Sequence, residues 1–322
     1  MTSPTSVAVR RYFFVVAALL PLLFPSLAGA ADYPSRAISL IVPYGAGGTT
    51  DISARRLAAL AEPLLGQPVV VENRPGGGGI NAMRGLAARK ADGYAVIATT
   101  SSPLFVTPAL RPVGYDPIAD FTSLMNYSGP YHGVLVRADS PYRSLDELLG
   151  AAAAGKRLTY GTAGALSGPR LTFTALVRKT SADLQHVPFS SASSVTAALL
   201  GGHIDIGLVP AYRDMVRGER LRLLAVLDDS RDPDFPAVPT LTDAGYAIEF
   251  PSIVGLMVPR GVPAERVERL RAAFAEAAAS EAFARDMDKL SQPVRILSGE
   301  QMDEVIQRNL AVYRSLAEEL KR

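Results

Sequence analysis

Short apolar segments with strand character alternate along this chain with amphipathic segments of helical period, and many of the apolar segments end in loops of Gly, Ser and Thr. In the first hundred residues, strands are predicted at 38–42, 69–71 and 94–98, with helices at 51–65 and 80–89 between them. This β-α-β-α-β order predicts a parallel sheet covered by helices, and hence an α/β fold. Pro63 predicts that the first helix kinks or ends early.

A second series of strands and helices begins beyond residue 127. Its strands are predicted at 133–136, 158–161, 186–189 and 204–208, and the chain returns through an apolar segment at 221–227. The C-terminal part adds one strand and three helices, predicted at 253–258, 264–279, 281–290 and 299–320. Two sequential α/β units joined by short crossings predict two lobes with a cleft between them.

The first 30 residues have the order of a cleavable export signal. Arg10 and Arg11 precede an apolar run, and Ala28-Gly29-Ala30 places small residues before Ala31. The run is short for a membrane span and is interrupted by Pro21 and Pro25, which favours a removed signal peptide over an anchor. The paired arginines leave both the general and the twin-arginine export routes open. We therefore expect a periplasmic protein.

Charge and cysteine content narrow the function classes further. The sequence has 33 Lys and Arg against 31 Asp and Glu, and removal of the two signal-peptide arginines balances them. A balanced charge gives no indication of nucleic-acid binding. The chain has no cysteine, so it neither forms disulfides nor risks mispairing them after export.

The predicted strand ends are the places where an open α/β sheet binds ligands. The loop 43–51 carries three glycines and then Thr49, Thr50 and Asp51, directly before a helix. Free N–H groups at such a helix start favour an anion. The loop lacks the Gly-Lys-Ser/Thr of a nucleotide-binding loop, and Asp51 is interpreted as a helix cap rather than a ligand contact. The loop 162–170 repeats the arrangement in the second unit, where Arg170 points either to the ligand or to solvent.

Groups suited to catalysis or metal binding are scarce in these loops. The three histidines, His132, His186 and His203, do not stand at metal-ligand spacing and are interpreted as structural or exposed. Ser167 has no base partner evident in the sequence, and neither a zinc-protease nor a nucleophile-elbow motif occurs. The sequence thus predicts a binding protein without cofactor, metal or catalytic residues.

Blocks along the whole chain beyond the signal closely resemble the tripartite tricarboxylate transporter receptors, the Bug family. The matching blocks are Tyr33-Pro34-Ser35-Arg36, Gly47-Gly48-Thr49-Thr50-Asp51, Glu72-Asn73-Arg74-Pro75-Gly76, Asp92-Gly93-Tyr94, Tyr160-Gly161-Thr162-Ala163-Gly164, Leu199-Leu200-Gly201-Gly202-His203 and Pro259-Arg260-Gly261-Val262-Pro263.

The resemblance implies a type II periplasmic-binding-protein fold in which crossing hinge strands join two lobes. Its first lobe would comprise 32–127 plus 226–322, and its second 128–225. The family receives carboxylate-bearing solutes for a membrane permease, which implies a monomer that docks transiently on permease subunits. The ligand-binding positions carried over from the family are Tyr44, Gly45, Thr49, Thr50, Asp51, Ser101, Ser102, Thr162, Ala163 and Ser167.

Three positions depart from the family pattern, and all lie on the ligand side of the second lobe. Val209 stands near a common acidic residue, Ser190 in place of a common lysine, and Arg170 in place of a common histidine. The arginine favours a second anionic group on the ligand, whereas Val209 and Phe189 favour an apolar or aromatic body. A sensory receptor that signals to a histidine kinase, or a hydrolase on the same lobes, are the alternatives.

Overall fold

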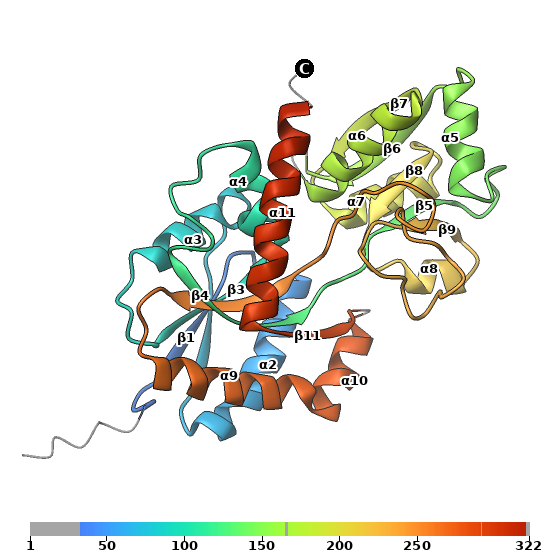
Figure 1. Cartoon of the computed structure of the whole chain (residues 1–322). Helices are drawn as coiled ribbons and strands as arrows, with labels where there is room; N and C mark the ends of the chain where they lie inside the picture. The colour runs from blue at the N-terminus through green and yellow to red at the C-terminus, as the bar shows by residue number, and fades with distance from the viewer. Residues whose placement is uncertain (1–32, 165–166, 291, 320–322) are drawn as a thin grey trace, which may run out of the picture. The chain divides into compact units, whose positions relative to one another are not determined.

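The computed structural model describes residues 33–164, 167–290 and 292–319. The predicted signal peptide, 1–30, lies outside the described residues. By its internal contacts the chain from Arg36 onward forms one unit, organised around a six-stranded and a five-stranded sheet (Figure 1). The α/β class with two lobes that the sequence predicts is confirmed.

The six-stranded sheet follows the order β11-β4-β10-β3-β1-β2. Its strands are β1 (Ile38–Val42), β2 (Val69–Asn73), β3 (Ala95–Thr100), β4 (Phe121–Ser128), β10 (Val254–Pro259) and β11 (Val294–Ser298). The predicted parallel sheet holds for β1 with β2 and β3, whereas β10 runs antiparallel to β3 and β4, and β11 antiparallel to β4. The sequence missed β4 because polar Ser123, Asn126 and Ser128 interrupt its apolar run, although all three are buried.

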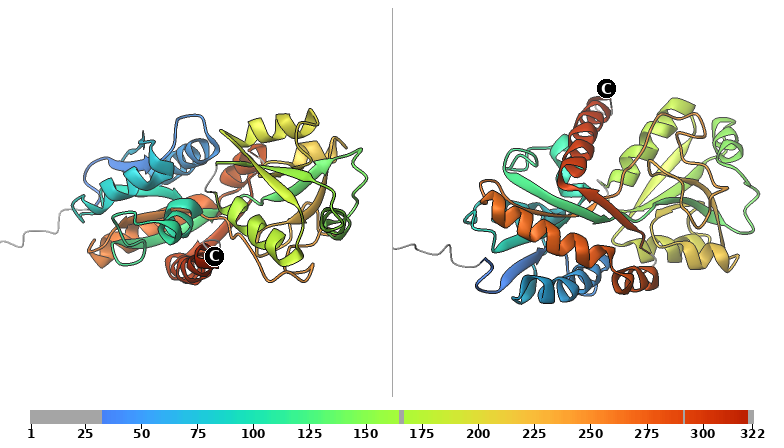
Figure 2. Two further views of the ribbon diagram at one scale, coloured as in Figure 1. Left: turned by 90° about the horizontal axis from the view of Figure 1, so that it is seen from above. Right: turned by 60° about the horizontal axis from the view of Figure 1, so that its bottom comes forward.

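Helices cover both faces of this sheet. One layer contains α2 (Thr49–Leu65), α9 (Ala264–Ala279) and α10 (Glu281–Lys289), which contact one another and which the right-hand view of Figure 2 brings forward. The other face carries η1 (Gly77–Gly79), α3 (Ile80–Ala87), η2 (Ser102–Val106), α4 (Thr107–Leu110) and α11 (Gly299–Glu319). Helix α2 runs through Pro63, against expectation, because only its last turn follows and Gly66 donates its N–H to the Glu62 carbonyl at 2.9 Å.

The five-stranded sheet follows the order β7-β6-β8-β5-β9. Its strands are β5 (Gly133–Arg137), β6 (Leu158–Ala163), β7 (Leu184–Phe189), β8 (Ile206–Val209) and β9 (Leu221–Val226). Its helices are α5 (Leu145–Ala153), α6 (Gly168–Thr180), α7 (Ala192–Leu200) and α8 (Arg213–Arg217). The strands β7, β6 and β8 run parallel, so their carboxyl ends lie at one edge of the sheet. The loops before α6 and α7 therefore lie at this edge as well.

The chain passes between the sheets at 129–132 and again at 227–253. The crossings are bonded together, since Leu227 donates its N–H to the His132 carbonyl at 2.9 Å. Asp228 in the second crossing pairs with Arg295 of β11 at 2.7 Å. The lobe limits at 127/128 and 225/226 stay predictions. The strands next to these limits belong to different sheets: β4 and β10 to the six-stranded sheet, β5 and β9 to the five-stranded sheet. Among the described residues, no helix is long and apolar enough to cross a membrane.

Candidate functional site

A cavity of about 210 Å³ lies where the strand ends of both sheets meet the two crossings. The ends of β3, β6 and β8, with the loops and helix starts that follow β1, β3, β6 and β8, supply one part of its lining. The crossings supply a second part, and Val254 at the start of β10 and Gln292 before β11 complete it. The lining residues are Thr49, Thr50, Thr100, Ser101, Ser102, Pro130, His132, Ala163, Ser167, Pro169, Leu208, Pro210, Phe250, Ser252, Ile253, Val254 and Gln292.

The start of α2 contributes Thr49 and Thr50. Its N-cap, Gly48, provides no side chain to satisfy the first N–H groups of the helix. Asp51 is buried and accepts hydrogen bonds from the Gly47 N–H at 2.8 Å and from Asn73 at 2.8 Å. Burial tends to raise the pKa of Asp51, but the hydrogen bonds from Arg55, Gly47 and Asn73 outweigh it and lower that pKa. Asp51 therefore holds the loop in place as an ionised carboxylate.

The start of α6 contributes Ser167. This residue is the N-cap, yet its hydroxyl does not cap the helix, and within the described part of the chain its buried Oγ has no hydrogen-bond partner. The next residue, Gly168, must be small, because a Cβ there would lie 2.0 Å from Cε2 of Phe250. An unsatisfied hydroxyl and an uncapped helix start therefore lie together at this wall of the cavity.

His132 and Phe250 come from the two crossings and pack edge to face, with ring centroids 5.2 Å apart. Burial lowers the pKa of His132 to about 4, and the Pro130 backbone opposes this only in part. The imidazole is therefore neutral at physiological pH. Its Nδ1 is buried and, like the Ser167 hydroxyl, lacks a partner among the residues described.

Several residues predicted from the sequence lie on the cavity wall. They are Thr49, Thr50, Ser101, Ser102, Ala163 and Ser167. The Ser101 hydroxyl also has a structural role, because it donates to the Pro251 carbonyl at 3.0 Å and accepts from the Ile253 N–H at 2.8 Å. It thereby ties the end of β3 to the second crossing.

Other predicted residues stand behind this wall or away from it. The Tyr44 hydroxyl bonds to Thr100, which lines the cavity, and Thr162 bonds to His186 Nε2 at 2.8 Å. Gly45 and Ser190 are exposed. Direct contact of these residues with a ligand stays a prediction.

Val209 and Arg170, which were also predicted as ligand-binding residues, lie outside the cavity lining. Val209 packs in the core of the second sheet with Leu135 and Val195. Arg170 is not among the cavity-lining residues. Burial lowers the pKa of His186, and the nearby charge of Arg170 lowers it further. The sequence analysis in turn missed His132 and Phe250, which line the cavity from the crossings.

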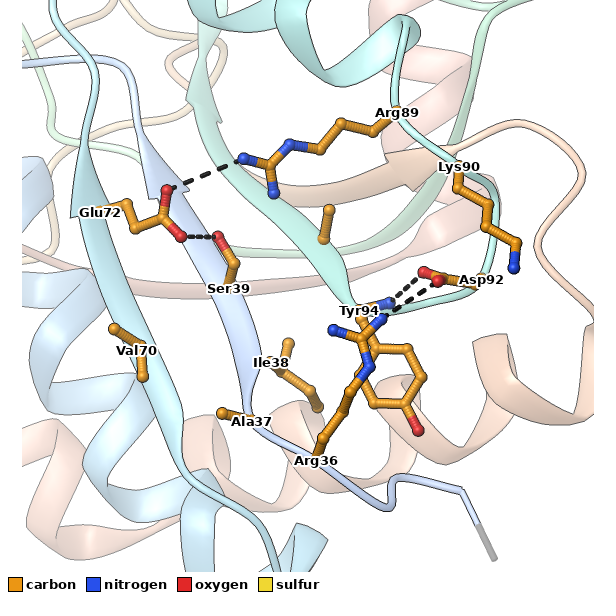
Figure 3. Close-up of a pocket in the computed structure, with 11 residues that line it drawn as sticks. Arg36, Ala37, Ile38, Ser39, Val70, Glu72, Arg89, Lys90, Asp92 and Tyr94 are labelled. Carbon is orange, nitrogen blue, oxygen red and sulfur yellow. Dashed lines mark hydrogen bonds and ion pairs between the residues drawn. The ribbon is translucent and has the colours of Figure 1, made fainter. Parts of the chain in front are cut away.

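A larger hollow of about 430 Å³ lies at the opposite ends of β1 and β3 (Figure 3). Four of its five charged residues form two ion pairs: Arg36 with Asp92 at 3.2 Å, and Glu72 with Arg89 at 3.8 Å; the fifth is Lys90. Glu72 also accepts from Ser39 at 2.6 Å. This hollow is a surface network remote from the strand ends where the helix starts converge.

Known proteins resemble this chain over most of its length. The family model for the tripartite tricarboxylate transporter family receptor matches residues 53–321. The UPF0065 protein in the gbd 5′ region of Cupriavidus necator is 36% identical over 277 residues, covering 83% of this chain and 84% of that protein. Protein BugT of Bordetella pertussis is 34% identical over 260 residues, covering 79% of each.

Solved structures extend the likeness to the fold. A ligand-free TctC solute-binding protein from Polaromonas superposes with a TM-score of 0.80 at 32% identity, covering 89% of this chain and 99% of that one. An adipate-bound protein from Rhodopseudomonas palustris gives 0.75 at 28% identity, covering 89% and 98%. MatC from the same species, with bound malate, gives 0.73 at 26% identity, covering 88% and 100%.

Proposed function

The chain belongs to the tripartite tricarboxylate transporter receptor family, and we propose that it binds a small carboxylate-bearing solute in the cavity between its sheets. In this proposal it is exported to the periplasm and carries the solute to the permease subunits of a membrane transporter. Two members of the same fold hold malate and adipate, which are both carboxylates.

The observation that carries the proposal is the convergence of two uncapped helix starts on one cavity. The first N–H groups of α2, and the Gly168 N–H at the start of α6, lack partners within their helices, and neither N-cap side chain bonds to them. Pro169, the second residue of α6, has no N–H. The hydroxyls of Thr49, Thr50 and Ser167 stand beside them. A carboxylate accepts hydrogen bonds from such donors, and the helix dipoles favour its charge.

We further propose that the protein acts as a monomer without catalysis, cofactor or metal. The receptor family supports binding without catalysis, and so does the isolation of the Ser167 hydroxyl, which forms no hydrogen bond to a histidine or carboxylate in residues 33–164, 167–290 and 292–319. A serine nucleophile requires such a base. Balanced charge in the exported chain supports a small solute rather than nucleic acid as the ligand.

Calorimetric titration and thermal shift with a panel of mono-, di- and tricarboxylates test the proposal. A ligand at a hundred times its Kd stabilises the folded state by about 2.7 kcal/mol, which for a chain of this size raises the Tm on the order of 5 °C. Thr50→Val and Ser167→Ala should each weaken binding about tenfold or more, since each removes a hydrogen bond to a charged group. Thr242→Val, at an exposed threonine away from the cavity, is the control. If no carboxylate in the panel stabilises the protein, the proposal is wrong.

A further inference from the structure

The cavity has a second polar end beside the carboxyl end of β4, away from the start of α2. Val254, at the start of β10, pairs with Thr100 of β3 on one side and with Ser128 of β4 on the other, so β3 and β4 end at the same edge. In the sheet order β1, β3, β10, β4, the end of β1, which leads into α2, and the end of β4 are three strand spacings apart, about 14 Å. A solute that contacts both ends therefore needs a polar group at each of its own ends.

Gln292 supplies the main group at this second end. It lines the cavity just before β11, and only 4% of the residue is exposed. Its backbone N–H donates to the Met287 carbonyl at 3.0 Å, which fixes the residue in place. The side-chain Oε1 lies 3.5 Å from Ser128 Oγ, a hydroxyl that donates to the closer Pro293 carbonyl at 2.8 Å. Gln292 Nε2 has no partner in the described part of the chain, so its hydrogens are available to a ligand.

Ser252 adds a hydroxyl to the same end. It lies on the second crossing and lines the cavity, and its N–H donates to Asp228 at 3.3 Å. Its carbonyl lies so close to Gly129 that a Cβ there would be 2.1 Å from the oxygen. Because Gly129 directly follows Ser128, Ser252 and Gln292 both adjoin the end of β4. Like the carboxamide nitrogen, the Ser252 hydroxyl forms no hydrogen bond to the residues described.

Donors without partners at a buried end of the cavity favour a ligand that accepts hydrogen bonds. Leaving such groups unpaired is destabilising, so a ligand that supplies the missing bonds gains affinity. A carboxamide N–H donates to a carboxylate or carboxamide oxygen, whereas an ammonium group, which only donates, finds no acceptor at this nitrogen. Val254, in the row between the two ends, offers an apolar contact to the carbon chain that links the polar groups of the solute.

We propose that Gln292 is a specificity-determining residue. With Ser252 beside it, Gln292 binds a carboxylate or carboxamide oxygen at the far end of a solute whose first carboxylate is held at the starts of α2 and α6. This inference rests on the proposed function. It assigns recognition of the far end to one side chain, so a change at Gln292 affects solutes that carry a far acceptor and spares those that do not.

Calorimetric titration with succinate, glutarate, adipate and pimelate first identifies the chain length that binds most tightly. At that length the diacid and its monoamide are compared with the plain monoacid, which for adipate means adipamate and hexanoate. The wild type should bind both at least about threefold more tightly than the monoacid. Gln292→Met should weaken binding of the monoamide about threefold to tenfold and of the diacid about tenfold or more, and leave the monoacid nearly unchanged. Gln307→Met, at an exposed glutamine on α11, is the control.

Gln292→Glu tests the direction of the hydrogen bond at about pH 8. A carboxylate at this position repels the far carboxylate of the diacid and attracts the ammonium group of the ω-amino acid of the same length, so the ratio of their affinities should fall at least about tenfold. An unchanged preference in Gln292→Met, or an unchanged ratio in Gln292→Glu, overturns the inference and leaves the proposed function intact. Should neither variant fold, equal wild-type affinities for the diacid, the monoamide and the monoacid overturn it. If none of the acids binds the wild type, the proposed function fails as well.

Discussion

Replacing Arg295 with methionine will leave a buried carboxylate without its charge partner at the second crossing. The Asp228 side chain is inaccessible to solvent, and Arg295 Nη1 lies 2.7 Å from its Oδ1. The Asp229 N–H at 3.0 Å and the Ser252 N–H at 3.3 Å are additional, uncharged donors to this carboxylate. Breaking a buried ion pair by removing one partner costs about 3–5 kcal/mol, so the free energy of unfolding should fall by about that amount near pH 8.

The pH dependence of this loss follows from the Asp228 carboxyl. Burial raises its pKa, and the Arg295 guanidinium opposes that rise, so the variant should have a still higher folded-state pKa. A folded-state pKa above the unfolded value means that the native protein binds the extra proton, and stability falls as pH rises. Protonating the carboxyl from an unfolded-state pKa of about 3.9 costs about 5.5 kcal/mol at pH 8 but about 2 kcal/mol at pH 5.5. The loss in Arg295→Met should therefore shrink to about 2 kcal/mol or less at the lower pH.

Urea denaturation of the wild type and the variant at both pH values measures the loss. Arg285→Met is the matched control, because Arg285 pairs with Glu281 on the surface of α10 and its loss should cost less than about 0.5 kcal/mol. Adding Asp228→Asn to Arg295→Met should recover much of the stability, since the fully buried charge is then removed, and Asp229, the second partner of Arg295 at 2.8 Å, is partly exposed to solvent. A loss below about 1 kcal/mol at pH 8, or one that does not change with pH, would refute the reasoning.

Two further predictions concern the walls of the cavity. Gly168→Ala should displace the Phe250 ring, because the new Cβ would lie 2.0 Å from it. The free energy of unfolding should fall by about 1–3 kcal/mol, and carboxylate binding should weaken. The control is Gly150→Ala on an exposed stretch of α5, where the new Cβ meets nothing within 4 Å, and this substitution should be neutral or stabilising. Wild-type affinity in Gly168→Ala would count against Phe250 as a wall of the site. Ser101→Ala leaves the Ile253 N–H without its acceptor and should cost about 1–3 kcal/mol in urea denaturation, whereas a change below about 0.5 kcal/mol would contradict its bridging role.

Local patterns in the sequence were enough to predict much of the site. Thr49, Thr50 and Ser167 each follow a strand and begin a helix, and in an α/β fold such positions gather at the carboxyl edge of a sheet. All three residues line the cavity. Strand and helix positions were likewise predictable wherever apolar residues kept a regular period.

The position of Val209 shows how strongly such reasoning depends on the register of a strand. Successive side chains of a strand point to opposite faces, so an error of one residue in the register assigns a core side chain to the cleft, or the reverse. Leu208 and Pro210 line the cavity, whereas Val209 between them packs in the core with Val195. The sequence identified a strand end that lines the cavity, whereas the side chains that face the cavity depend on the register of β8. Ligand contact by Val209 stays a prediction.

His132 was beyond local patterns altogether. It lies in a crossing of a few residues, and its place in the cavity depends on Phe250, more than a hundred residues further along the chain. Burial also decides its neutral state, and burial follows from packing between distant segments. A lone histidine in the sequence carries no signal of either property.

A crystal structure of the protein with the tightest-binding carboxylate of the panel tests the central claim most directly. We predict density for the ligand in the cavity of about 210 Å³, with its carboxylate within hydrogen-bonding distance of Thr49 or Thr50 on α2 and of Ser167 or the Gly168 N–H on α6. Density in the hollow beside Arg36 and Tyr94, or a ligand whose carboxylate contacts neither helix start, would contradict it.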